Sequence, residues 1–382
     1  MSASTATAQP APDAAPPVRK ERIVSLDAAR AIVVALMIFM DHPMIAAALP
    51  TFLVHPEWDG FRLPDFVFPA FIFMAGVSLA FSVGKKKEFS YRDSVLPFLK
   101  RIGMLFGIGL GLNFLKYGVS KGAAGLVFHP LRFMGVLQRI ALSSLIAWPF
   151  ARSRRTTVLA VAAALLVAHA AVLMLVAMPG GEAGALDSKT ENISAYIDRA
   201  VLGEPHTYGG RGYDPEGVLG TLSSGAQALL GLFVGQWLVA FPKDKKRLLQ
   251  LLGIGVLWTV LGAALGGVIP VNKQLWTPTF VLVSSGVATM SLVTLYWIAD
   301  YLGQKRWFEW LVPLGRNALL IYILSNVLLV AMRVTGVFPG AAEALSGSIP
   351  PVLATLTFQV AEVAMWFVVA SWLHRRKIYF KI

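Results

Sequence analysis

The chain contains no cysteine and has few charged residues for its length. Without cysteine it forms no disulfide, thiolate zinc site or iron–sulfur cluster, and it has no cysteine nucleophile. Charged residues are 14% of its 382 residues, against roughly 25% in ordinary soluble domains. Hydrophobic residues are 56%. Such a chain cannot cover itself with a polar surface, so most of it is expected to face lipid. The same composition excludes a disordered, collagen-like or coiled-coil protein.

Residues 1–21 are rich in Ala, Pro and Ser and contain no apolar core. They therefore predict a disordered cytoplasmic tail rather than a secretory signal. The remainder, 22–382, is expected to form a single transmembrane domain.

Ten apolar runs are long enough to cross a bilayer as helices. They cover residues 27–50, 66–84, 96–115, 132–151, 156–181, 218–242, 248–272, 274–299, 311–332 and 350–373. Closed barrels of short alternating strands do not fit continuous apolar runs. The fold class expected is all-α, a polytopic membrane bundle of about ten helices with both termini cytoplasmic.

The distribution of Lys and Arg is consistent with this orientation. Of 34 such residues, 22 fall in the segments assigned to the inside and nine in those assigned to the outside. Because positive residues collect in cytoplasmic loops, topology explains most of the net charge of +13, and no nucleic-acid partner is expected. Two outer segments, about 50–64 and 179–217, are too long to be simple connectors and are expected to be functional.

Three arginines lie inside predicted spans: Arg30, Arg139 and Arg316. An ionisable group at membrane depth is costly and is a functional candidate by default. A planar guanidinium that keeps its charge suits phosphate groups, so these arginines predict a phosphate-rich ligand. For Arg30, an intrahelical pair with Asp27 is the structural alternative.

The first outer segment has the densest group of reactive side chains, with His55, Trp58 and Asp65 close together. Histidine is the side chain best suited to act as a general base near neutral pH. Asp41 lies where Pro43 is expected to break the preceding helix and turn side chains toward a pocket. The spacing of histidines and carboxylates matches no specific metal site, so no metal is expected.

The second outer segment ends in a stretch that contains Asp214 and Glu216 among aromatic residues. Carboxylates can bind the hydroxyls of a sugar, and aromatic rings can stack on its apolar faces. Ordinary turn and helix-start chemistry is the structural alternative. Asn192 begins a glycosylation sequon, which we take to be a chance occurrence.

Seven short motifs occur in a specific order and spacing. They are Arg22–Arg30, His55–Gly60, Asp65–Pro69, Gly135–Arg139, Tyr196–Gly203, Tyr213–Thr221 and Gly315–Ala318. Together they resemble the heparan-α-glucosaminide N-acetyltransferase family, in a compact bacterial form. The resemblance covers residues 22 to about 239 and extends more loosely to the end of the chain.

This resemblance implies an acyltransferase that moves an acetyl group from cytoplasmic acetyl-CoA to the amine of a glucosamine-type sugar. The family's active-site histidine falls on His55. The family's nearby asparagine falls on Asp41, a departure that leaves the acceptor open. The candidate ligands of acetyl-CoA are Arg30, Gln138, Arg139, Arg316 and Asn317. The candidate ligands of the acceptor sugar are Trp58, Asp65, Asp214 and Glu216.

Several alternatives remain open at this stage. A ternary complex with His55 as base is the preferred mechanism, and an acetyl-histidine intermediate is the alternative. A carrier of a sugar or lipid-linked sugar, without chemical change, is the alternative function. The expected location is the bacterial cytoplasmic membrane, and a homodimer is left open.

Overall fold

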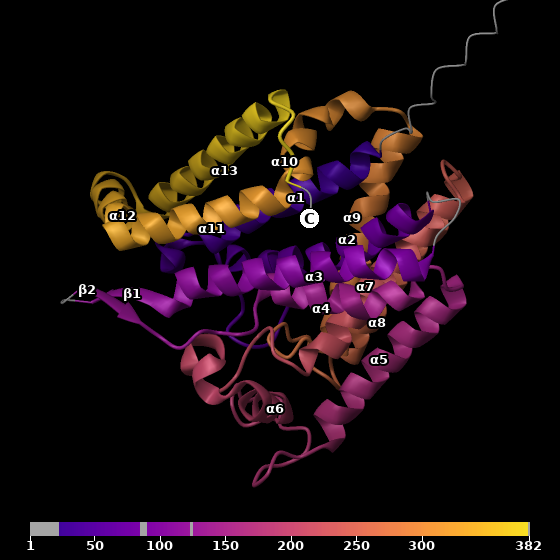
Figure 1. Cartoon of the computed structure of the whole chain (residues 1–382), viewed down its shortest axis with the longest axis horizontal. Coiled ribbons are helices and arrows are strands. Elements are labelled where there is room, and N and C mark those ends of the chain that lie inside the picture. Colours follow the sequence, from indigo (N-terminus) through magenta and orange to yellow (C-terminus); the bar gives the residue numbers. More distant parts are fainter. Residues whose placement is uncertain (1–22, 85–89, 123–124, 381–382) are drawn as a thin grey trace, which may run out of the picture.

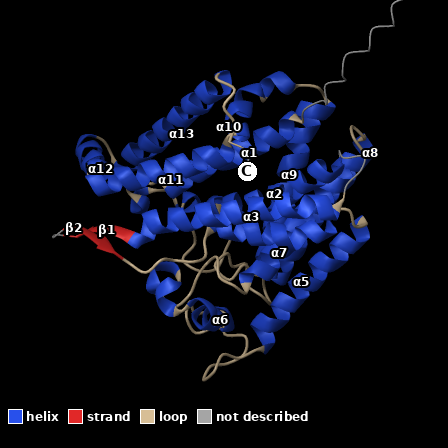
Figure 2. Cartoon of the chain, in the orientation of Figure 1, coloured by secondary structure: helices blue, strands red, loops and turns tan. Residues whose placement is uncertain are grey.

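The chain folds into a bundle of helices in the computed structural model, which describes residues 23–84, 90–122 and 125–380 (Figure 1). The predicted tail, 1–21, lies outside these residues. The helices are α1 Val24–Asp41, α2 Leu63–Gly84, α3 Tyr91–Asn113, α4 Val136–Ala147, α5 Arg155–Leu175, α6 Ile193–Leu202, α7 Gly220–Ala240, α8 Lys245–Leu265, α9 Pro278–Tyr296, α10 Val312–Arg316, α11 Ala318–Thr335, α12 Val337–Ser348 and α13 Pro351–Arg375. Figure 2 shows one antiparallel hairpin beside them, β1 Val119–Gly122 and β2 Gly125–Phe128.

Among the described residues, eight helices are long and apolar enough to cross a membrane. The predicted all-α membrane bundle is therefore confirmed. The two remaining predicted spans correspond to α1, which carries three charged residues, and to α4, which has 12 residues. The count of ten spans and the cytoplasmic position of the termini stay predictions.

The boundaries of three predicted spans are wrong. α1 ends at Asp41, just before Pro43, so the first span stops well short of residue 50. Arg132 precedes α4 rather than lying inside it, because its side chain bonds to an outer segment. The predicted span 311–332 is divided into α10 and α11 at Asn317, whose backbone leaves the helical region.

Helices α2 and α7 pack so closely at the centre of the bundle that glycine is required at their contact. A Cβ on Gly76 would lie 1.9 Å from the carbonyl oxygen of Ala228, and one on Gly231 would lie 2.0 Å from that of Phe73. Small residues permit such close backbone approach between membrane helices. This contact sets the centre of the main apolar core, to which α1 and α9 also contribute.

The outer helices α5, α8, α11 and α13 present large apolar side chains at the surface. Leu257 and Val260 of α8 are 60% and 59% exposed, and Val368 of α13 is 69% exposed. In water this surface would be costly, whereas in a bilayer it meets hydrocarbon. The chain is therefore a multi-pass membrane protein.

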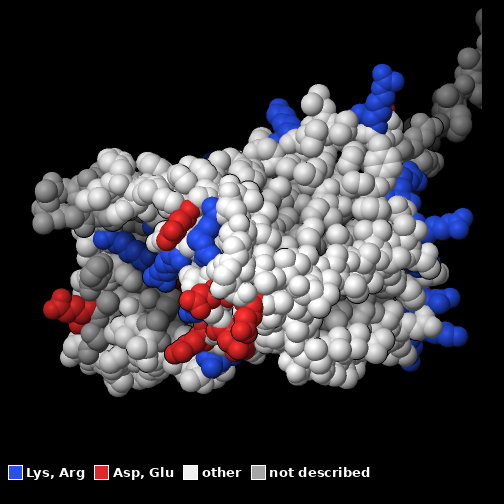
Figure 3. All heavy atoms as spheres, turned by 90° about the horizontal axis from the view of Figure 1, so that it is seen from below, with Lys and Arg blue, Asp and Glu red and all other residues white. Residues whose placement is uncertain are grey.

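Charged side chains are unevenly distributed along the bundle. Figure 3 shows Lys and Arg protruding along one edge of the displayed face, while Asp and Glu gather in the opposite half. Helices α5 and α8 begin in basic sequence, at Arg155 and Lys245. This asymmetry agrees with the predicted orientation, in which the basic end is cytoplasmic.

The close contact of α2 with α7 generates a stability prediction. We expect Gly76→Ala to lower the free energy of unfolding by at least ~1–3 kcal/mol, because the new Cβ has no room. Gly253→Ala in α8 is the matched control, since a Cβ there meets nothing within 4 Å. Thermal unfolding in detergent measures both variants. Equal melting temperatures would contradict the packing described here.

Candidate active site

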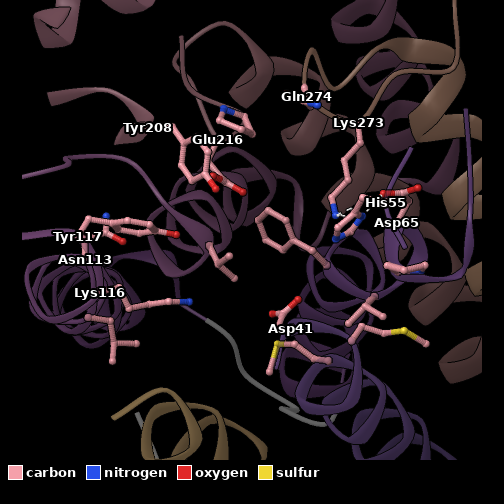
Figure 4. Close-up of a pocket in the computed structure, with 18 of the residues that line it drawn as sticks. Asp41, His55, Asp65, Asn113, Lys116, Tyr117, Tyr208, Glu216, Lys273 and Gln274 are labelled. Carbon is pink, nitrogen blue, oxygen red and sulfur yellow. Dashed lines mark hydrogen bonds and ion pairs between the residues drawn. The ribbon is translucent and has the colours of Figure 1, made fainter. Parts of the chain in front are cut away.

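A large cavity of about 590 Å³ lies between the end of α1, the start of α2, the end of α3 and the outer segments. Its polar lining comes from residues far apart in the chain (Figure 4). They are Asp41, His55, Asp65, Asn113, Lys116, Tyr117, Arg132, Gln138, Tyr208, Glu216, Lys273, Gln274, Tyr322 and Arg333. The cavity thus combines a histidine, three carboxylates and four basic side chains.

His55 and Asp65 form a hydrogen-bonded pair in the wall of this cavity. The Nδ1 atom of His55 lies 2.6 Å from Oδ1 of Asp65. The Asp65 side chain is 1% exposed, whereas that of His55 is 46% exposed. A proton on Nδ1 shared with the carboxylate leaves Nε2 as the unprotonated nitrogen, which is the arrangement of a general base.

The start of α2 holds Asp65 in place. Asp65 lies in the first turn of this helix, where a carboxylate interacts favourably with the helix dipole. Its Oδ2 atom accepts a hydrogen bond of 3.0 Å from the backbone N–H of Arg62. The ammonium of Lys273 lies 3.5 Å from Oδ1 and 3.5 Å from Nδ1 of His55. The helix start, Arg62 and Lys273 therefore hold the Asp65 carboxylate in position independently of its bond to His55.

The loop that contains His55 is tied to the loop between α8 and α9. Asn272 donates to the carbonyl of Trp58 at 3.2 Å and to the carboxylate of Asp59 at 2.9 Å. Gly60 donates its N–H to the carbonyl of Val271 at 2.8 Å. These bonds bring Lys273 to the histidine across more than two hundred residues of chain. The indole N–H of Trp58 donates to the carbonyl of Leu186 at 2.6 Å, so Trp58 also anchors the second outer segment.

Asp41 reaches the cavity from the last turn of α1. Its carboxylate points into the space seen in Figure 4, and no hydrogen bond or ion pair joins it to another described residue. The next residue, His42, is buried and bonds through Nδ1 to Oε1 of Glu362 at 2.7 Å. Gln359 donates to the carbonyl of Phe39. Helix α13 thus fixes the end of α1 and, with it, the position of Asp41.

Arg132 joins the second outer segment to the cavity. Its guanidinium donates to Asp214 through Nε at 2.8 Å and Nη2 at 2.5 Å, and it also pairs with Glu216. The rings of Tyr117 and Tyr208 flank it at 5.3 Å and 4.7 Å. Burial opposes ionisation of Glu216, but Arg132 outweighs it and holds the pKa of Glu216 below its usual value. The guanidinium of Arg132 therefore has its counter-charges on both Asp214 and Glu216.

Asp198 of α6 orders the turn that carries these carboxylates. Its two oxygens accept the backbone N–H groups of Asp214 at 3.1 Å and Val218 at 2.8 Å. Burial raises the pKa of Asp198 to about 7, and the two N–H groups partly oppose this shift. A Cβ on Gly217 would lie 2.2 Å from the Asp198 carboxylate, which explains the glycine at that point of the turn.

A smaller cavity of about 430 Å³ carries arginines from three helices: Arg30 of α1, Arg101 of α3 and Arg316 of α10. Arg30 donates to the hydroxyl of Ser78 at 2.5 Å and pairs with Asp27 at 3.6 Å. Helix α10 packs directly on α1, since a Cβ on Gly315 would lie 1.9 Å from the carbonyl oxygen of Asp27.

One wall of side chains, here called the partition, separates the two cavities. Met37 of α1, Val136 and Leu137 of α4 and Tyr322 of α11 line both of them. Along α1, Arg30 and Asp41 are separated by about 16 Å of helix rise, so the cavities lie at different depths of the bundle. Next to the partition, Gln138 lines the large cavity, is 1% exposed and has no hydrogen-bond partner among the described residues.

Comparison with known proteins now adds to this geometry. Residues 22–180 match the model of the family described as heparan-alpha-glucosaminide N-acetyltransferase, catalytic. The resemblance to this family is confirmed. Two proteins named heparan-alpha-glucosaminide N-acetyltransferase, from mouse and human, are 25% and 26% identical to the chain over 94% of its length. The chain spans about 60% of the length of these curated relatives.

The residues that the family resemblance had suggested separate into three groups. The large cavity contains Asp41, His55, Trp58, Asp65, Gln138 and Glu216. The small cavity contains Arg30 and Arg316. The other three, Arg139, Asp214 and Asn317, line neither of these two cavities.

Arg139, Asp214 and Asn317 hold parts of the structure together. Arg139 is buried, donates to the carbonyl of Gly217 at 2.7 Å and lies 4.7 Å over the ring of Trp276. Asp214 holds Arg132. Asn317 bonds the C-terminal segment, donating to the carbonyl of Ile378 at 3.2 Å.

Sequence reasoning missed Lys116, Lys273 and Arg101 as cavity residues. The charge count had placed Arg101 with the inner segments and Lys116 and Lys273 with the outer segments. A π-helical turn after α3, Phe114–Gly118, directs Lys116 into the large cavity. A break in helical periodicity of this kind carries no clear sequence signal.

The Arg132 cluster generates a second stability prediction. We expect Arg132→Met to cost ~3–5 kcal/mol, because Asp214 and Glu216 would remain buried without their cation. Arg211→Met is the matched control, since Arg211 is exposed and its guanidinium lies over the ring of Tyr208, at 5.7 Å. Thermal unfolding in detergent compares the two variants. A variant at position 132 as stable as the control would show that the cluster does not hold the outer segment.

Proposed function

We propose that the protein is an integral membrane acyltransferase that moves an acetyl group from acetyl-CoA to the amine of a glucosamine-type sugar. One observation supports this most strongly. A cavity with a His55–Asp65 pair shares its partition with a second cavity that contains three arginines. The names of the mouse and human relatives point to the same reaction.

The small cavity is the proposed site of acetyl-CoA. Its arginines offer planar forks that bind phosphate oxygens through charge-assisted hydrogen bonds. Arg30 lies in the N-terminal half of α1, toward the predicted cytoplasmic side where acetyl-CoA is available, and Arg101 lies near the middle of α3. The apolar side chains of Met74, Leu105 and Leu137 in the same cavity suit the uncharged arm that carries the thioester. The acetyl group would then meet the acceptor at the shared partition.

The large cavity is the proposed site of the sugar amine. Nε2 of His55 takes a proton from the amine as its nitrogen forms a bond to the thioester carbonyl. The carbon–sulfur bond then breaks, and the thiolate of CoA leaves and is protonated. Asp65 keeps the proton of His55 on Nδ1 and stabilises the charged imidazole that forms. The amide of Gln138, buried and unpartnered beside the partition, would donate a hydrogen bond to the carbonyl oxygen.

Two alternatives are separated by one labelling experiment. If the acetyl group passes through His55, labelled acetyl-CoA without acceptor should leave label on the protein. If the protein is a carrier, no labelled acetyl-sugar should form under any condition. Purified protein, labelled acetyl-CoA and a panel of amino sugars, with products identified by mass, decide between them. The proposed ternary complex predicts a labelled sugar and an unlabelled protein.

Removing the base is the principal test of the mechanism. We expect His55→Ala to reduce the transfer rate by about 10² to 10⁴, because a positioned base contributes that much. Binding of acetyl-CoA should survive, since the arginine cavity lies on the other side of the partition. His206→Ala is the control, because His206 bonds the carbonyl of Leu131 at 2.7 Å and lies outside both cavities. A folded His55→Ala protein with near wild-type transfer would remove His55 from the mechanism.

The assignment of the small cavity predicts the opposite pattern. We expect Arg30→Gln to weaken acetyl-CoA binding about tenfold or more, through loss of a charge-assisted bond to phosphate. Calorimetry with the purified protein measures the dissociation constant. Arg306→Gln is the control, because Arg306 is exposed and lies outside the cavity. Unchanged affinity in a folded Arg30→Gln protein would place acetyl-CoA elsewhere.

A further inference from the structure

The charged side chains around the large cavity divide into those that neutralise one another and those that do not. Three carboxylates and four basic side chains line it. Arg132 pairs with Glu216 and with Asp214 behind it. Lys273 pairs with Asp65 at 3.5 Å. Arg132 and Lys273 therefore already have counter-charges within the protein.

Asp41, Lys116 and Arg333 remain after this pairing. In the part of the chain that the structure describes, none of the three forms an ion pair. Lys116 donates one hydrogen bond, of 2.8 Å, to the amide oxygen of Asn326, which leaves the ammonium with further N–H groups. The guanidinium of Arg333 lies 5.6 Å from the ring of Phe338. An ammonium at this depth is costly to keep without a counter-charge.

Lys116 and Arg333 belong to the same wall of the cavity. Lys116 is bonded to Asn326 of α11, and Arg333 lies seven residues further along that helix. A separation of seven residues places both positions on one helix face, and side chains tilt toward the helix N-terminus. Arg333 and Lys116 both line the large cavity. Figure 4 shows Asp41 pointing into the cavity from the opposite wall.

We propose that the acceptor is an amino sugar that carries an anionic substituent, with Lys116 and Arg333 binding the anion and Asp41 binding the ammonium. This proposal rests on the proposed function and narrows its substrate class. A zwitterionic acceptor would place an opposite charge beside each of these three side chains, which form no ion pair among the described residues. Either a phosphate or a carboxylate on the sugar could bind to Lys116 and Arg333, because both groups accept hydrogen bonds from Lys and Arg.

A purely structural account predicts a different result. If Lys116 only balances the charge of Asp41 across the cavity, replacing it should impair neutral and anionic acceptors equally. If it binds the substituent, replacing it should impair the anionic acceptor more. The ratio of kcat/KM for anionic over neutral sugar therefore separates the two accounts, whatever happens to overall activity.

The experiment uses the full-length protein with acetyl-CoA and three acceptors. They are glucosamine, glucosamine with a phosphate on its 6-hydroxyl, and glucosamine with a carboxyethyl ether on its 3-hydroxyl. We expect at least one anionic sugar to be preferred by about tenfold or more, the amount that one charge-assisted bond provides. The two anionic sugars distinguish phosphate from carboxylate. Lys116→Gln and Arg333→Gln should each remove most of the preference, and Lys189→Gln, in an exposed outer loop, should retain it.

Each outcome bears on the proposal. Equal kcat/KM for all three sugars in the wild-type protein would overturn it, as would an unchanged ratio in Lys116→Gln. If no sugar is acetylated, the proposed function fails, and calorimetry with the same sugars tests the inference separately. Binding of an anionic sugar that is tighter than that of glucosamine and is lost in Lys116→Gln would uphold it. Equal or absent binding would overturn it.

Discussion

A charge inside an apolar bundle must be paired, or must have a ligand to pair with, because hydrocarbon offers it no solvation. The chain follows this constraint almost everywhere. Arg132 is surrounded by Asp214 and Glu216, His42 meets Glu362, and Lys273 meets Asp65. These pairs hold loops and helix ends in place. Three charged side chains that form no ion pair among the described residues, Asp41, Lys116 and Arg333, line the large cavity. The same rule therefore bears on both the scaffold and the site.

Helix α1 connects the two halves of this arrangement. The carboxylate of Asp300 accepts the N–H groups of Val24 and Ser25, which caps a helix start that has no partner of its own. From that fixed end the helix places Arg30 in the small cavity, Met37 in the partition and Asp41 in the large cavity. Because one rigid element carries all three, the distance between the cavities does not depend on loops. This suits a reaction in which two substrates meet from opposite sides.

The sequence predicted the helical membrane bundle and much of the site, for identifiable reasons. Long apolar runs have few structural options, so the helices were found with errors mainly at their ends. Asp41 was selected because Pro43 was expected to end the preceding helix, and His55 because it lies in a dense group of reactive side chains and matches the histidine of the family it resembles. The partner of His55 was not identified, since Asp65 was expected to meet the sugar. Asp65 lies ten residues after His55. From the sequence alone, its carboxylate could equally well face solvent or bond to the imidazole, because the path of the backbone between them is not known.

Other charged residues show what the sequence leaves open. Arg139 was selected as a phosphate ligand because it lies deep in an apolar run; that role stays a prediction, and in the structure Arg139 bonds to Gly217 and lies over Trp276. Lys116 and Arg101 were counted with the outer and inner segments, yet both line cavities. The side chain that pairs with a charge comes from a distant part of the chain, and pairing decides whether that charge is structural or available. A single sequence reveals that a charge is buried, but it does not reveal its partner.

The position of Asp41 bears on how the proposed reaction removes protons from the acceptor amine. An amine that arrives as an ammonium has to lose one proton before its nitrogen can attack and a second after the new bond forms. One of these protons ends on the thiolate of CoA, and the other must reach water. Asp41 lines the large cavity and has no hydrogen bond or ion pair among the described residues, so in the proposed reaction its carboxylate would bind the ammonium and offer the first proton a route to solvent. His55, held by Asp65, then takes the second proton. An asparagine at this position would orient the amine through hydrogen bonds but would accept no proton. The change from the family's asparagine to Asp41 therefore suits an acceptor that enters the cavity in its charged form.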